Sequence, residues 1–69
     1  MNKEIKKSIS TLESVSDVIL KVNLSNQAEY DSLKDLDSEK AIRLDEELEC
    51  LSDAYQSLNE SIGFLKQIK

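Results

Sequence analysis

The sequence predicts an all-α fold, an antiparallel helical hairpin of the coiled-coil type. Apolar residues recur at steps of three and four along two long segments, which is typical of amphipathic helices. The chain contains no proline and one glycine, so little in it interrupts a helix. Its 69 residues have room for one small domain. We therefore expect residues 1–69 to form a single helical-hairpin domain.

The first helix is expected at about residues 3–23. Its apolar positions are Ile5, Ile9, Leu12, Val15, Ile19 and Val22. The stretch "VILKVNL" near its end has the composition of a strand, but one strand would have no partner in this chain. We therefore predict helix there too.

A tight turn is predicted at residues 23–26, because Asn and Ser cluster there and favour caps and turns. Ser25 or Asn26 would then cap a long second helix at about residues 27–68. A break near residues 36–38 is left open, together with a kink or short third helix. The candidate caps for that break are Asp35, Asp37 and Ser38. The alternative is a continuous helix with a stutter before Ala41.

The second helix carries two adjacent apolar stripes. The first is a heptad seam made of Ala41, Leu44, Leu48, Leu51, Tyr55, Leu58, Ile62 and Leu65. Beside it lies a second stripe made of Cys50, Ala54, Ser57, Ser61, Phe64 and Ile68. The opposite side carries acids and faces water. One stripe on each helix is enough to pack the two helices of a hairpin together. Another element or another chain must therefore bury the second stripe.

We expect a partner protein to cover part of this wide face. The predicted contact residues are Leu51, Ala54, Leu58, Ser61, Ile62, Phe64, Leu65 and Ile68. Gly63, which costs helix stability, suggests close packing nearby. The alternative is that the first helix and residues 28–36 cover the whole face, as in a three-helix bundle.

Composition restricts the classes of partner. The net charge is −5, with about +1 in residues 1–24 and about −6 in the remainder. An acidic chain without a basic patch is a poor nucleic-acid binder. No apolar run is long enough to span a membrane, and the lysine-rich start lacks the apolar stretch of a signal peptide. The lone Cys50 fits a reducing cytoplasm.

No catalytic, metal-binding or cofactor-binding residues are predicted. The chain lacks histidine and a glycine-rich loop, and one cysteine cannot build a zinc site. The densest carboxylate group, Asp45 to Glu49, is expected to be a solvated face rather than an acid–base pair. Cys50 is expected to be a partly buried packing residue, without a neighbouring base. We expect Tyr30 to be a boundary residue.

Two segments, "TLESVSDVI" (residues 11–19) and "SLNESIGFL" (residues 57–65), resemble the small cochaperones of type III secretion needle subunits. That family consists of short helical hairpins, although its second helix is shorter than the one predicted here. The resemblance implies a cochaperone that pairs with a helical-repeat chaperone and keeps a needle subunit soluble before export.

A different segment, "EELECLSDAYQSL" (residues 46–58), is similar to the second helix of small aspartyl-phosphate phosphatases that act on sporulation response regulators. Their signature is Ser-Gln-Glu-Leu-Asp. This chain has Asp45-Glu46-Glu47-Leu48-Glu49 instead, so the Ser and Gln are missing. The resemblance implies at most a regulator without that catalysis.

The sequence therefore predicts a small, acidic, non-enzymatic adaptor or cochaperone that binds another protein in the cytoplasm. Acids that flank the seam, such as Asp45 and Glu47, favour a partner with a basic rim. The competing hypothesis is a regulator that self-associates into a homodimeric four-helix bundle.

Overall fold

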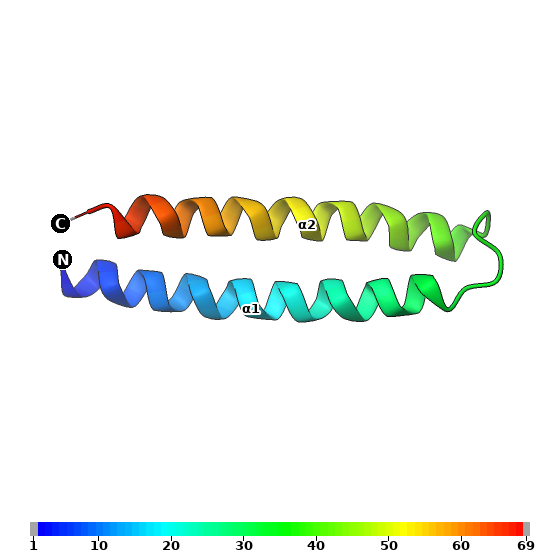
Figure 1. The fold of residues 1–69 in the computed structure, drawn as a ribbon, viewed down its shortest axis with the longest axis horizontal. Helices are drawn as coiled ribbons and strands as arrows, with labels where there is room; N and C mark the ends of the chain where they lie inside the picture. Colours follow the sequence, from blue (N-terminus) through cyan, green and yellow to red (C-terminus); the bar gives the residue numbers. More distant parts are fainter. Residues whose placement is uncertain (1, 69) are drawn as a thin grey trace.

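The computed structural model describes residues 2–68 and confirms the all-α hairpin. Helix α1 spans Lys3–Asp31 and helix α2 spans Glu39–Lys66. The two helices run antiparallel, so the two ends of the chain lie together and the connection lies at the other end (Figure 1). The hairpin measures 51 × 14 × 12 Å. It is a single layer of two helices that leaves both broad faces open.

Polar side chains begin both helices. The Asn2 side chain accepts a hydrogen bond from the backbone N–H of Glu4, at 2.7 Å. The Ser38 hydroxyl accepts one from the N–H of Ala41, at 3.1 Å. Each bond satisfies a backbone donor that has no partner within the helix. Ser38 was one of the candidate caps for the break near residues 36–38.

The turn predicted at residues 23–26 is wrong. Helix α1 continues to Asp31, and the connection is residues 32–38. Asn23 and Asn26 lie half-buried toward α2, and the Asn26 amide donates a hydrogen bond to Glu47 at 3.2 Å. The preference of Asn for turns is a weak local effect that packing overrides.

The seam of α1 differs from the predicted one. Val15 is 43% exposed and Val22 is 44% exposed, while Ser16 is buried and Asn23 is half-buried. The residues that lie toward α2 are Ile5, Ile9, Leu12, Ser16, Ile19, Asn23, Asn26, Tyr30 and Leu33. These positions alternate steps of four and three, whereas the predicted set takes two successive steps of three and drifts around the helix. Two long helices stay in contact only along the alternating seam.

The predicted seam of α2 is confirmed. Each of its eight residues, from Ala41 to Leu65, is buried or half-buried, and each lies three or four positions from the next. The buried apolar side chains of the described residues are Ile9, Ala41, Leu44 and Ile62. The core is therefore one thin line between the two helices, as expected when only two elements pack together.

Candidate functional site

The structure divides the eight predicted partner-contact residues into two sets. Leu51, Leu58, Ile62 and Leu65 belong to the seam, and Ile62 is only 6% exposed because α1 covers it. For Ile62 the predicted partner contact is wrong. The other four, Ala54, Ser61, Phe64 and Ile68, are exposed members of the second stripe.

Helix α1 adds apolar residues to the side on which the second stripe lies. Val22 lines an open groove together with Glu47 and Cys50 of α2. Val18 and Val15 lie one and two turns before Val22, on the same side of α1. The three valines and the second stripe therefore form one surface across both helices.

We call this surface the shared face. It consists of Val15, Val18, Val22, Cys50, Ala54, Ser57, Ser61, Phe64 and Ile68. Each of these residues is exposed; Val18 is 58% exposed and Phe64 is 70% exposed. The sequence interpretation missed the valines because it assigned Val15 and Val22 to the core. Their regular spacing with Thr11 and Ser25 was the signal that could have revealed them.

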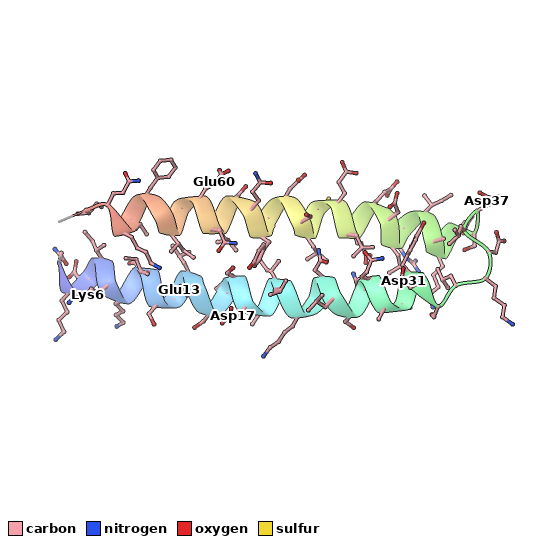
Figure 2. All side chains as sticks on the ribbon, viewed as in Figure 1. Lys6, Glu13, Asp17, Asp31, Asp37 and Glu60 are labelled. Atoms are coloured by element: carbon pink, nitrogen blue, oxygen red, sulfur yellow. The ribbon has the colours of Figure 1, made fainter. Side chains whose placement is uncertain are left out.

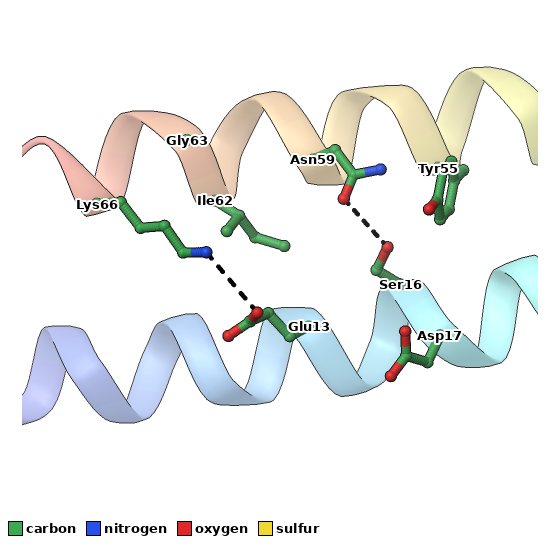
Figure 3. A pocket seen from close by; sticks show the side chains of 8 residues that line it. All are labelled: Glu13, Ser16, Asp17, Tyr55, Asn59, Ile62, Gly63 and Lys66. Atoms are coloured by element: carbon green, nitrogen blue, oxygen red, sulfur yellow. Dashed lines mark hydrogen bonds and ion pairs between the residues drawn. The ribbon is translucent and has the colours of Figure 1, made fainter.

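The opposite face of the hairpin is polar. Figure 3 shows its hollow between the helices, where Lys66 pairs with Glu13 at 3.8 Å and Ser16 bonds to Asn59 at 3.4 Å. Leu20 and Leu24, one turn apart on α1, are exposed on this side. A pair of exposed apolar side chains is ordinary on a protein surface. The shared face carries the larger set, with three valines of α1 beside Ala54, Phe64 and Ile68 of α2.

Charged residues border the shared face near the connection. Glu47 lines the same groove as Val22 and Arg43, and Lys40 pairs with Glu29 of α1 at 2.8 Å. Asp45, the other acid predicted to flank the seam, instead lines a hollow on the opposite side. Only Glu47 of the two predicted acids is therefore placed to meet a partner on the shared face.

The expectation for Cys50 is wrong. Cys50 is exposed rather than partly buried, because it lies outside the seam. The close packing expected near Gly63 is not made within the hairpin, since a Cβ built on it would meet no neighbouring side chain or second helix within 4 Å. Packing of a partner on Gly63 stays a prediction.

The carboxylates of the "DEELE" segment, Asp45, Glu46, Glu47 and Glu49, are all exposed. Among residues 2–68, no three side chains of the His, Cys, Asp or Glu type are grouped as a metal site would require. Neither helix is long and apolar enough, within the same residues, to cross a membrane.

Comparisons of the chain with protein-family models, curated proteins and solved structures find no match. The function must be argued from the residues.

Proposed function

We propose that the protein is a small, non-enzymatic binding module that buries its shared face against another polypeptide. The observation that carries the proposal is the alignment of two apolar stripes, one from each helix, on one side of the hairpin. Water contacts all of these side chains in the isolated chain. Their burial would gain roughly 25 cal/mol for each square ångström of apolar surface.

The composition of the shared face supports binding to a helix. Ala54, Ser57 and Ser61 are small, so the backbone of a partner helix can come close to α2. Phe64 extends beyond them and is 70% exposed, so it is suited to fill a pocket in the partner. A large apolar anchor beside small residues is a common arrangement at interfaces.

The finer form of the proposal is that the module acts as a cochaperone, in type III secretion or a similar pathway. Its support is the family resemblance of residues 11–19 and 57–65, which include Val15 and Val18 and also Ser61 and Phe64 of the shared face. A cochaperone of this kind would share its apolar face with a helical chaperone in the cytoplasm.

The test compares two substitutions of nearly equal exposure on opposite faces. Val18 is 58% exposed on the shared face, and Leu24 is 60% exposed on the other. Val18→Asp should abolish recovery of the bound polypeptide in quantitative co-purification from the native cell, because a buried carboxylate lacks a partner. Leu24→Asp should leave recovery unchanged, and circular dichroism should show equal helicity for both variants.

Equal recovery with Val18→Asp and Leu24→Asp would contradict the proposal. Loss with Leu24→Asp alone would assign binding to the opposite face instead. Phe64→Ala provides an independent check, since it removes a ring that the hairpin itself leaves uncovered and should weaken binding without reducing helicity.

A further inference from the structure

We propose that the polypeptide on the shared face is a second copy of this chain, in an antiparallel dimer with the chain termini at opposite ends. This inference rests on the general form of the proposed function, burial of the shared face against a polypeptide, and it puts a second copy in place of the chaperone of the finer form. It adds the identity of the occupant and its orientation. Three features of the hairpin point to it: its exposed area, the charges at its two ends and the central position of the valines.

The solvent-exposed area of the hairpin is larger than that of a compact protein of the same mass. The excess is about the area that each partner buries in a standard protein–protein interface. The hairpin exposes 5356 Å². A compact monomer of its mass would expose roughly 4,400 Å² by the usual scaling with mass. The surplus of roughly 1,000 Å² is comparable to the roughly 800 Å² that each partner buries in a standard interface.

Charge is distributed unequally between the two ends of the hairpin. The end that carries the termini, residues 2–10 and 60–68, has four lysines and two carboxylates, a net charge of +2. The end that carries the connection, residues 24–50, has nine carboxylates and three basic residues, a net charge of −6. Figure 2 shows Lys6 toward the first end and Asp31 and Asp37 at the second.

This polarity selects one of two symmetric arrangements. A two-fold axis parallel to the helices would bring the two −6 ends together, which costs energy. A two-fold axis perpendicular to the helices brings the +2 end of each copy beside the −6 end of the other. Most of these charges lie beside the shared face rather than on it, so they act through the field of the whole hairpin. That field favours the second arrangement and steers the encounter toward it.

The perpendicular axis also makes the shared face self-complementary. In a two-fold interface the same patch of both copies meets, so residues near the axis face their own counterparts. Val15 and Val18 flank the middle of α1, which spans Lys3–Asp31. An axis there would pack the valines of α1 against the valines of the other copy. The small residues Ala54, Ser57 and Ser61 would let the two α2 helices approach closely.

The experiment combines sedimentation equilibrium with a distance between spin labels. In a Cys50→Ser background, Lys3→Cys places one label near the chain terminus of each copy, away from the shared face. Residues 3 and 31 are about 42 Å apart along α1, at about 1.5 Å per residue. The antiparallel dimer should therefore give a label-to-label distance of about 40 Å or more. Mixing chains labelled at Lys3→Cys with chains labelled at Lys34→Cys should give a short distance.

The full chain should sediment as a dimer, and Val18→Asp should raise its dissociation constant at least about tenfold, while Leu24→Asp should not. A dimer with Lys3→Cys labels within about 25 Å of each other would overturn the antiparallel arrangement, since parallel copies would place them across one bundle diameter. If the chain is a monomer and its binding of an apolar dye depends on Val18 and Phe64, the proposed dimer is wrong but the proposed function stands. A monomer that binds no dye and is cooperatively stable would overturn both.

Discussion

Ser16 of α1 and Asn59 of α2 meet across the hairpin, with the Ser16 hydroxyl donating to the Asn59 side-chain oxygen at 3.4 Å. Ser16 is only 4% exposed, whereas its neighbour Val15 is 43% exposed. The hairpin thus buries a serine and leaves a valine in water. Within one chain the opposite order would bury more apolar surface, and covering Val15 with a partner would recover part of that loss.

Ser16→Leu should stabilise the isolated hairpin. Leucine would fill the line between Ile9, Leu12 and Ile19, beside an open hollow of about 310 Å³. We expect the free energy of unfolding to rise by roughly 1–2 kcal/mol, from urea denaturation at a concentration where the chain is monomeric.

The control is Ser14→Leu, because Ser14 is exposed and gains the same helix propensity. It should change the free energy of unfolding by no more than about 0.5 kcal/mol. An equal gain from both substitutions would mean that position 16 is not in the seam.

Ser38→Ala should destabilise the chain by about 1 kcal/mol, because it removes the hydroxyl that caps α2 at 3.1 Å from the N–H of Ala41. Ser25→Ala is the matched control. Ser25 lies inside α1, so alanine there should leave stability unchanged or raise it slightly. Thermal denaturation followed by circular dichroism measures both. A greater loss of stability from Ser25→Ala than from Ser38→Ala would support the turn predicted at residues 23–26.

Gly63→Ala should raise the free energy of unfolding by about 1 kcal/mol. Alanine forms helix more readily than glycine, and no atom lies within 4 Å of the added methyl group. Chemical denaturation of the monomer measures the gain. Should the substitution stabilise the monomer but weaken association, a partner must pack directly on Gly63, and the interface would extend past the shared face.

Neutralising three acids at the connection should weaken the antiparallel dimer. Asp31→Asn, Asp37→Asn and Glu46→Gln together reduce the charge of that end from −6 to −3. The attraction to the +2 end of the other copy falls, so the dissociation constant should rise several-fold. The effect should be larger at low salt, where charges act over longer distances.

The control makes an equal change of net charge in the middle of the hairpin, through Glu13→Gln, Asp17→Asn and Asp53→Asn. General repulsion between the two acidic chains falls by the same amount in both triple variants. The control should therefore leave association unchanged or tighten it. Sedimentation equilibrium decides the matter, and tighter association of the connection variant would favour the parallel arrangement.

The helical character of the chain and the seam of α2 followed from the sequence alone. Both are local properties: the chain has no proline, and the spacing from Ala41 to Leu65 alternates without interruption. The exposed stripe of Ala54, Ser61 and Phe64 was also predictable, since it is set by the geometry of a single helix.

Only the tertiary structure decided where the chain turns and which side of α1 faces α2. The seam of α2 is long, and it can be covered only if α1 extends to Asp31, past the Asn and Ser residues that favour a turn. The regular alternation of the α2 seam then places Ser16 and Asn23 toward α2, in preference to the more apolar Val15 and Val22. These choices depend on contacts between residues far apart in the sequence. The position of the valines beside the second stripe is a consequence of that pairing.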